Sequence, residues 1–241
     1  MEQEKNFEIK RTQLIKDIEE AFKNVELGDG IGPNEAFAID ERLEENSLEY
    51  KDFKAKDERH NWKKVIFYPT EESNGSKYFS MREGADSNNN IDYTHWRSFS
   101  DVAGKRFSFA PYMIYILLQR DFSNVPDLLG LDIGEISFII NDDEEEYSDH
   151  FKKQYSELFA SFSRNQKNII KNFVDFDIEL GKHRSNLLEN EEYINDIETK
   201  LYNNFKAKCG IENWIIEKKQ NVIDFIKRKE NEKKIIEELS K

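Results

Sequence analysis

The sequence predicts a mainly α-helical protein, an α+β fold with a minor β element, whose helices surround one buried central helix. Three observations predict this fold. Apolar residues recur at three- and four-residue spacing in several segments, as they do in amphipathic helices. The stretch Phe99–Asp121 is the most apolar and aromatic part of the chain and lies between two polar regions. Finally, 18 Phe, 10 Tyr and 3 Trp provide enough apolar surface for a core, although 35% of the residues are charged.

The central helix is expected to begin at Pro111, because the fixed φ of proline suits the first turn of a helix. The residues that follow, Tyr112–Leu118, are apolar on every side. A helix without a polar face is normally buried on several sides, so this segment is expected to be enclosed by the other helices. Just before it, Phe107 and Phe109 alternate with small residues, which indicates a short extended segment.

A first helix is expected near the N-terminus. It begins after the N-cap residue Thr12 and ends at Gly28 and Gly30, which are typical of helix stops. Charged residues occupy its outer face. An apolar stripe predicts its inner face: Leu14, Ile15, Ile18, Ala21, Phe22 and Val25.

The next region is expected to form short helical pieces. Asn34 is a candidate cap for the first of them. Residues 44–55 are charged and weakly patterned, so no element is predicted there. A further helical segment is expected to begin at Asp57 and to place Trp62 and Val65 on its inner side.

A polar insertion is predicted at 69–97, where Asn-Gly and a run of three asparagines are typical of turns. Two short strands within it, at 77–81 and 91–96, are expected to pair as a hairpin. Residues 136–140 are the best single strand candidate in the chain. These segments make up the minor β element of the predicted fold.

A helix is predicted at 151–162, and a capping box follows it. In this motif the hydroxyl of Ser163 accepts the amide three residues later, and Gln166 reaches back to the amide of Ser163. The helix that the capping box starts is expected to end at Gly181, because glycine commonly follows the last turn of a helix.

Two further apolar stripes predict helices at 189–208 and 213–239. Such neighbours commonly form an antiparallel hairpin, packed here against the body of the protein or against another subunit. We therefore divide the chain into a main helical domain at 1–182 and a C-terminal helical hairpin at 183–241.

The composition favours an acidic cytoplasmic protein. The formal net charge of −13 argues against direct binding to nucleic acid or to an anionic membrane. An acidic surface keeps a protein in solution and can also attract a basic partner. The single cysteine, Cys209, allows no disulfide within the chain, which fits a reducing compartment. The N-terminus is charged where a signal peptide would be apolar, and no transmembrane segment is apparent.

No strong catalytic or metal-binding motif is present, so neither a metal nor a cofactor is expected. The four histidines are scattered, and the glycines near residue 30 match neither a phosphate-binding loop nor a dinucleotide fingerprint. The nearest approach to an acid–base site is a polar cluster: Asp57, Glu58, His60, Tyr93 and His95. Because Glu58 and His60 would face different sides of a helix, a structural role is favoured over catalysis.

A run of carboxylates is the second candidate site: Asp142, Asp143, Glu144, Glu145 and Glu146. It lacks the alternating ligands and central glycine of an EF-hand loop. Two interpretations remain open. The run is either a hydrated acidic loop or the docking patch for a basic protein.

Several segments together resemble a bacterial protein family. They are RTQLIKDIEEAFKNVELGDGIG, AFAIDER, KDERHNWKKV, SFSDVAGKRFSFAPYMIYILLQRD and SFSRNQKNIIKNFVDFDIEL, in this order. Through them the chain resembles domain-of-unknown-function family 6714 over roughly residues 10–181, in pieces, with FSFAPYM as the best motif. The resemblance implies no activity, cofactor or catalytic residue. It does not extend to the insertion at 69–97, the acidic stretch at 141–150 or the C-terminal helices.

Three functional hypotheses follow. The first is a cytosolic interaction or inhibitor protein that binds a basic partner, such as an immunity protein that masks a toxin or a mimic of nucleic acid. The second is an enzyme with a carboxylate/His site near Asp57–His60. The third is an oligomeric scaffold formed through the C-terminal helices. The lack of catalytic motifs favours a protein that is not an enzyme.

Overall fold

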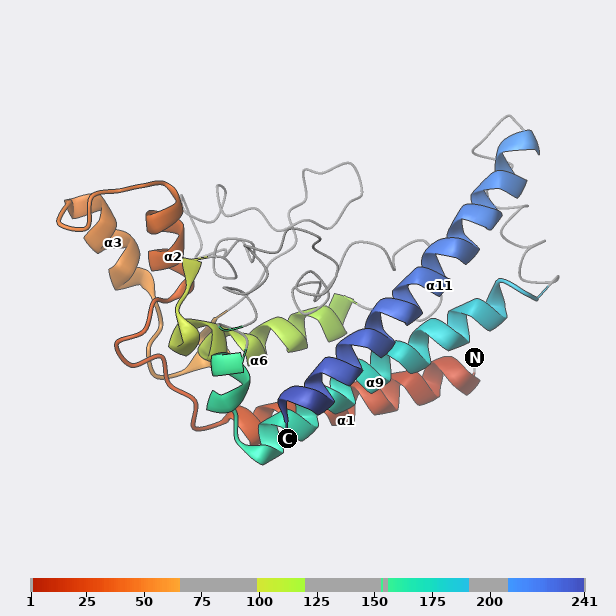
Figure 1. The fold of residues 1–241 in the computed structure, drawn as a ribbon, viewed down its shortest axis with the longest axis horizontal. Helices are drawn as coiled ribbons and strands as arrows, with labels where there is room; N and C mark the ends of the chain where they lie inside the picture. The colour runs from red at the N-terminus through yellow and green to blue at the C-terminus, as the bar shows by residue number, and fades with distance from the viewer. Residues whose placement is uncertain (1, 66–98, 120–152, 154–155, 191–207, 241) are drawn as a thin grey trace.

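The computed structural model describes residues 2–65, 99–119, 153, 156–190 and 208–240 (Figure 1). Within these ranges the chain is mainly helical, which confirms the predicted mainly α fold class, and these ranges contain no strand. The elements are α1 (Glu2–Phe22), α2 (Pro33–Asp40), α3 (Leu48–Lys56), the 3-10 helix η1 (Trp62–Lys64), α6 (Val102–Gln119), α9 (Arg164–Leu187) and α11 (Lys208–Leu239). The predicted strands at 77–81, 91–96 and 136–140 lie outside the described residues.

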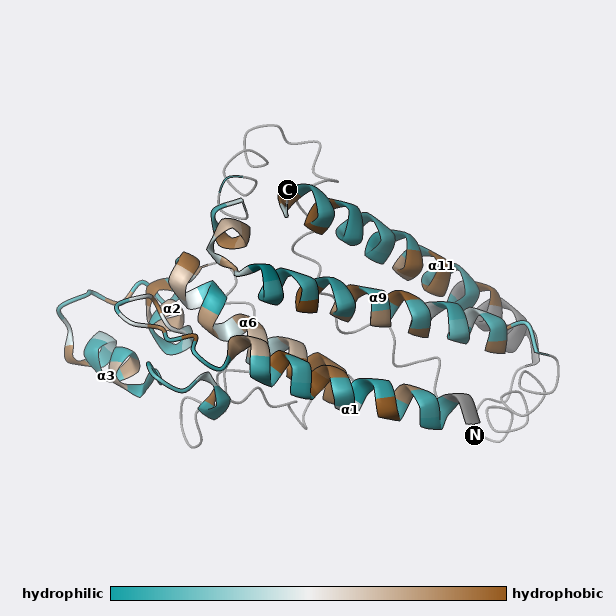
Figure 2. Cartoon of the chain, turned by 90° about the horizontal axis from the view of Figure 1, so that it is seen from below, coloured by the Kyte–Doolittle hydropathy of each residue, from teal (hydrophilic) through white to brown (hydrophobic). Residues whose placement is uncertain are grey.

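Three long helices lie side by side, with α9 between α1 and α11, and α6 packs against α1 (Figures 1 and 2). The helices α1 and α9 are antiparallel, because Gln166 near the start of α9 donates to the carbonyl of Ala21 near the end of α1, at 3.1 Å. Ion pairs between Lys171 and Glu237 and between Lys182 and Glu230 likewise make α9 and α11 antiparallel. The helices α2 and α3 form a separate lobe at one end of the molecule (Figure 1).

The last two described helices, α9 and α11, pack together as a C-terminal helical pair. Most of the helix predicted at 189–208 lies outside the described residues. The proposed domain boundary at 182 falls inside α9, which continues to Leu187. In addition, Ile236 of α11 belongs to the same hydrophobic core as α1, α6 and the first part of α9.

The segment expected to be a buried helix is part of α6. Tyr112, Met113, Ile116 and Leu117 are each at most 2% exposed. The enclosure ends at Leu118, which is 58% exposed. Most of the described side chains of this segment are therefore buried, as predicted.

Two expectations about the start of this helix were wrong. Phe107 and Phe109 are helical rather than extended, and Pro111 lies in the interior of α6 rather than in its first turn. Proline inside a helix removes one backbone hydrogen bond and costs about 3 kcal/mol. Phe107, Phe109 and Ala110 are all buried around Pro111, so tertiary packing outweighs the local preference of proline.

The predicted helix ends were less accurate than the apolar stripes. Thr12 is not an N-cap: α1 begins at Glu2, and the Thr12 hydroxyl donates to the carbonyl of Glu8 within the helix. Gly181 does not end α9 but lies inside it. The capping box of Ser163 and Gln166 is confirmed, with both of its hydrogen bonds present. Buried Leu14, Ile18, Phe22 and Val25 confirm the inner face of the first helix region.

The α2–α3 lobe also differs from expectation. Gly32, not Asn34, occupies the N-cap position of α2. Residues 48–56, for which no element was predicted, form α3, and the hydroxyl of Ser47 caps this helix by accepting the amide of Tyr50 at 3.1 Å. Asp57 ends α3 instead of beginning a helix.

The C-terminal end of α2 carries the one positive φ found at a non-glycine residue in the described ranges. Arg42 has φ 55°, and its amide donates to Ile39 at 3.0 Å. The amide of Leu43 donates to Ala38 at 3.0 Å, which completes a Schellman motif. Glycine normally occupies this left-handed position, because a side chain there costs about 1–2 kcal/mol.

We therefore expect Arg42→Gly to stabilise the protein. The relief of backbone strain exceeds the entropy that glycine loses on folding, which leaves a net gain of about 0.5–1 kcal/mol. Arg42→Ala is the matched control, since it removes the same charge but keeps the strained backbone. Urea denaturation of both variants measures the difference. Equal midpoints for the two would contradict the assignment of strain to this position.

His183 lies at the contact between α1 and α9. Its ring packs on Phe7 with centroids 5.2 Å apart, and Phe7 in turn packs edge-on against Phe176 at 5.9 Å. The Nε2 atom of His183 is buried without a hydrogen-bond partner. Burial lowers the pKa of His183 below its usual 6.5; nearby Glu4 opposes this shift and Arg184 adds to it.

This lowered pKa predicts a loss of stability on acidification. Between pH 6.5 and the lower folded pKa, the unfolded chain binds more protons at this residue than the folded chain does. The contribution of His183 is therefore fully present above this window and is lost as the pH falls through it. Thermal denaturation across this pH range should show a smaller pH dependence for His183→Gln than for the wild-type protein. An unchanged pH dependence would count against a neutral, buried His183.

Candidate functional site

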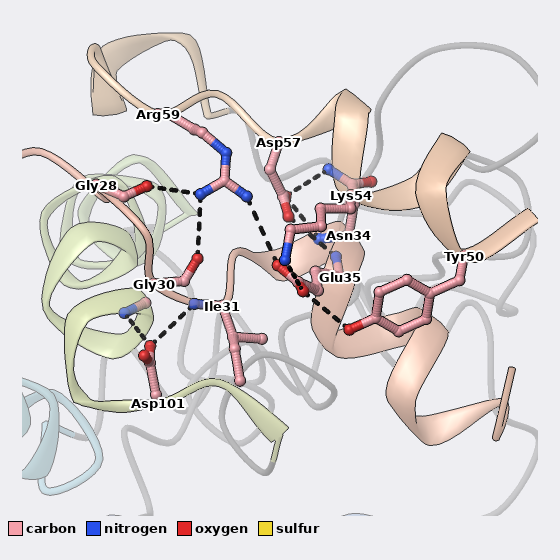
Figure 3. Close-up of polar contacts among 11 residues, drawn as sticks. Gly28, Gly30, Ile31, Asn34, Glu35, Tyr50, Lys54, Asp57, Arg59 and Asp101 are labelled. Atoms are coloured by element: carbon pink, nitrogen blue, oxygen red, sulfur yellow. Dashed lines mark hydrogen bonds and ion pairs between the residues drawn. The ribbon is translucent and has the colours of Figure 1, made fainter. Parts of the chain in front are cut away.

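The most extensive polar site in the described residues joins the α2–α3 lobe to the body of the protein (Figure 3). We call it the capping network. Its side chains are Glu35, Tyr50, Lys54, Asp57, Arg59 and Asp101, and its backbone groups come from the loop 28–32 and the start of α2. These residues come from four parts of the chain, so the network forms only in the folded protein.

Asp57 supplies the N-cap that α2 lacks. The N-cap position is held by Gly32, which has no side chain, and Pro33 follows it at the first helical position. The Asp57 carboxylate accepts hydrogen bonds from the Asn34 amide at 2.8 Å and from the Glu35 amide at 3.0 Å. It also accepts the Asn34 side-chain amide at 2.9 Å. A carboxylate at a helix N-terminus is favoured both by these donors and by the helix dipole.

Because Gly32 has no side chain, the Asp57 carboxylate can approach the start of α2. A Cβ atom at position 32 would lie 2.3 Å from the Asp57 Cγ, well inside contact distance. Burial raises the pKa of the Asp57 carboxyl, and the hydrogen bonds from Asn34 and Glu35 oppose this rise. Asp57 therefore acts as a cap delivered from outside the helix, 23 residues after Asn34.

Glu35 is the centre of the network. Its side chain is 4% exposed, and its Oε1 accepts the Tyr50 hydroxyl at 2.8 Å and the Lys54 ammonium at 2.5 Å. Its Oε2 lies 3.6 Å from Nη2 of Arg59. Burial, followed by the hydrogen bond to Glu35, raises the pKa of Tyr50 to about 12. Glu35 thereby ties α2 to α3 and to the segment that follows α3.

Arg59 and Asp101 attach the loop 28–32 to the body. Arg59 Nη1 donates to the carbonyls of Gly28 and Gly30, at 2.6 and 3.3 Å. Asp101 Oδ1 accepts the amide of Ile31 at 3.0 Å and that of Gly104, in the first turn of α6, at 2.8 Å. Each carboxylate in the network thus accepts at least two donors, an arrangement suited to holding backbone in place.

The predicted polar cluster does not converge in its described part. Asp57 points to α2, whereas Glu58 accepts the amides of His60 and Asn61, at 3.0 and 3.2 Å. The hydrogen bond from the His60 amide is the main reason that the pKa of Glu58 is lowered. The His60 side chain is 78% exposed, and its Nδ1 lies 3.8 Å from a carboxylate oxygen of Glu26. The three residues therefore have three separate sets of contacts.

The other predicted site residues lie outside the described ranges. They are Tyr93 and His95 of the polar cluster and the acidic run of Asp142, Asp143, Glu144, Glu145 and Glu146. Sequence reasoning missed Glu35, Arg59 and Asp101. One signal was available for the network as a whole: Gly32 precedes a helix-starting proline and has no capping side chain, so the first amides of this helix need an acceptor from water or from another part of the chain.

A second feature of the lobe is its acidic tip, residues 40–49, which joins α2 to α3. This segment, DERLEENSLE, contains five carboxylates and one basic residue. Glu41, Glu44, Glu45 and Glu49 are exposed, and none of them forms an ion pair with another described residue. Leu48 stands among them with 81% of its surface exposed. The tip therefore presents negative charge around one apolar side chain.

The described residues hold neither a group of metal ligands nor a helix that could span a membrane. His, Cys, Asp and Glu side chains nowhere gather in a group of three that could hold a metal ion there. None of the helices in these ranges combines the length and the apolar character needed to cross a membrane.

Comparison of the chain with protein-family models, with curated proteins and with solved structures gave no match. The resemblance to family 6714 therefore stays a prediction from the motifs quoted above.

Proposed function

We propose that this protein is an acidic cytosolic interaction module that binds a basic protein partner. The observation that carries the proposal is the acidic tip on the α2–α3 lobe. Four of its five carboxylates are exposed, whereas those of the capping network are engaged in holding the lobe. A net charge of −13 adds a long-range field that attracts a basic protein and repels nucleic acid.

Two observations support the acidic tip as a binding surface: its position is fixed, and it combines charged groups with an apolar one. The capping network anchors both ends of the lobe, through Asp57 and Glu35 at α2 and through Tyr50 and Lys54 at α3. A surface that is held in place loses less entropy on binding. Exposed Leu48 offers an apolar contact inside a charged rim, which is the usual arrangement of a protein interface.

The concrete form that we favour is an inhibitor or immunity-type protein that covers a basic surface of its partner. The acidic run Asp142–Glu146 is proposed as a second part of the same interface on the basis of its sequence. Membership of family 6714 is likewise a proposal. The contacts of Asp57, Glu58 and His60 give no support to the alternative of an enzyme.

The proposal is tested by capture of partners with the full chain from the cytoplasm of its own cells. We expect basic proteins to be retained by the wild-type chain, released at high salt and lost by the variant E41K/E44K/E45K. The control is E157K/E189K/E238K, which changes the net charge equally at exposed carboxylates far along the chain from the tip. A charge reversal of 142–146 forms the third arm.

Three outcomes are informative. Loss of the partner with the tip variant but not with the control supports the acidic tip as the interface. Loss with the 142–146 variant alone supports a basic partner but places the interface elsewhere. Equal recovery by every variant, or recovery of acidic proteins only, contradicts the proposal. Light scattering of the wild-type chain reports whether it forms oligomers, which is the scaffold alternative.

A further inference from the structure

Two exposed isoleucines lie on the side of α11 that faces away from α9. Ile216 is 65% exposed and Ile223 is 41% exposed. On the opposite side of the helix, Phe225 is 2% exposed and approaches Gly181 of α9. At 3.6 residues per turn, Ile216 and Ile223 lie about two turns apart on one side of the helix. One exposed apolar side chain is ordinary on a protein surface, but two in line form a short apolar stripe.

The first part of α11 extends beyond the end of α9. The two helices are antiparallel, and Leu188, which directly follows α9, packs with Val222 and Phe225. Because α11 begins at Lys208, roughly 20 Å of helix precedes this contact. Ile216 lies in that part of α11, so α9 does not cover it.

The same side of α11 has a charge of opposite sign at each end. We call it the outer face of α11 and define it by the positions Glu212, Ile216, Lys219, Gln220, Ile223 and Lys227. Glu212 precedes Ile216 by four residues, and Lys227 follows Ile223 by four residues. The Lys227 side chain is 69% exposed and lies 3.8 Å from Asp224 of the same helix. The outer face thus has an acidic end, an apolar stripe and a basic end.

This pattern is complementary to itself when a second copy runs in the opposite direction. With a two-fold axis between positions 219 and 220, Ile216 of each copy lies opposite Ile223 of the other. Glu212 of each copy then lies opposite Lys227 of the other, whereas a parallel alignment would set like charges against each other. Closed two-fold dimers, in which one patch pairs with itself, are the commonest oligomers.

The centre of such a pair is polar but tolerates a close approach. Lys219 and Gln220 lie at the axis. A lysine side chain can cover apolar surface with its stem while its charge remains in water. The two lysines therefore need not face each other directly.

The local charge of α11 also permits the contact. Residues 208–228 contain five basic and three acidic side chains, whereas the whole chain has a net charge of −13. Two copies that meet through this part of α11 avoid the repulsion that their acidic surfaces would cause elsewhere.

We propose that the outer face of α11 binds a second copy of the chain as an antiparallel helix pair. The isoleucines supply the apolar contact, and the two pairs of Glu212 with Lys227 set its direction. A contact of this size forms a weak and reversible dimer. The start of α11 and the α2–α3 lobe lie at opposite ends of the molecule (Figure 1), so the dimer leaves the acidic tip accessible. The inference is therefore independent of the function proposed above.

Sedimentation equilibrium of the full chain, under reducing conditions that exclude a disulfide between copies, tests this dimer. Because the interface is small, protein concentrations up to about 500 μM are needed. We expect the mass of the wild-type protein to rise toward that of a dimer. Ile216→Lys should weaken association about tenfold, because it brings a charge into the apolar contact. The matched control is Ile9→Lys, which changes an isoleucine that is 62% exposed on α1 and should leave association unchanged.

Charge reversal tests the direction of the pair. Glu212→Lys and Lys227→Glu should each weaken association about threefold or more, since each sets like charges against each other at both ends of the contact. An equimolar mixture of these two variants restores opposite charges at both ends and should associate as the wild type does. The double variant E212K/K227E should do the same.

Three outcomes overturn the proposal. They are a wild-type protein that stays monomeric over this range, equal association of Ile216→Lys and the wild type, and no recovery in either the mixture or E212K/K227E. If Ile216→Lys loses its helical circular dichroism, the charge-reversal variants decide. Their recovery on mixing requires that both are folded.

Discussion

Replacement of Asp57 by alanine is expected to lower the free energy of unfolding by about 3–5 kcal/mol, since a buried donor left without an acceptor costs about 1–3 kcal/mol. Three donors lose their acceptor: the amides of Asn34 and Glu35 and the side-chain amide of Asn34. Because Asp57 is 8% exposed, water has little access to replace the carboxylate. Urea denaturation measures the loss.

The neighbouring carboxylate provides the control for this prediction. Glu58 also accepts two backbone amides, but its side chain is more exposed, so Glu58→Ala should cost about 1 kcal/mol or less. Asp57→Asn keeps one carbonyl oxygen as an acceptor and should fall between the two. Equal losses for Asp57→Ala and Glu58→Ala would show that capping of α2 by Asp57 adds nothing to stability.

Gly104→Ala is expected to destabilise the protein by about 3 kcal/mol or more, which is at the upper end of the usual cost of overpacking. A Cβ at this position would lie 1.8 Å from the carbonyl oxygen of Ile31. That atom belongs to backbone, which Asp101 and Arg59 hold in place through Ile31 and Gly30. The clash is therefore not relieved by rotation of a side chain.

The sign of this result is diagnostic. Within a helix, replacement of glycine by alanine normally stabilises by about 0.5–1 kcal/mol. A loss must therefore come from the contact with the loop 28–32. A gain in stability for Gly104→Ala, measured by urea denaturation, would contradict the close approach of this loop to α6.

The parts of the fold that depend on local pattern were predictable. The stripe of Leu14, Ile18 and Phe22 and the capping box of Ser163 are encoded within one or two turns of a helix, and both are present. The apolar run at Tyr112–Leu118 required burial, and the structure encloses most of it.

The errors arose where tertiary contacts outweigh local preference. Pro111 and Gly181 are residues that commonly begin or end helices, yet each lies inside one. Apolar side chains close to Pro111 and to Gly181 in the sequence are buried in the core. A helix that continues through these two residues preserves the core contacts of those side chains. Local propensity is a weak prior when burial opposes it.

The capping network shows why a site can escape sequence reasoning. Asp57 was expected to cap a helix, and it does, but the helix is α2 rather than one that Asp57 itself begins. Its partners lie 22 and 23 residues earlier, and no pattern links them within one helix. Arg59 and Asp101 reach the loop 28–32 from still greater separations in sequence.

Amide hydrogen exchange at Asn34 and Glu35 tests the central claim most directly, namely that Asp57 fixes the α2–α3 lobe by capping α2 from outside. The account predicts that both amides are protected in the wild-type protein and lose this protection in Asp57→Ala. The amide of Gln166, which Ser163 caps within α9, should keep its protection in both proteins. Rapid exchange of Asn34 and Glu35 in the wild type, or equal protection with and without the Asp57 carboxylate, would contradict the account.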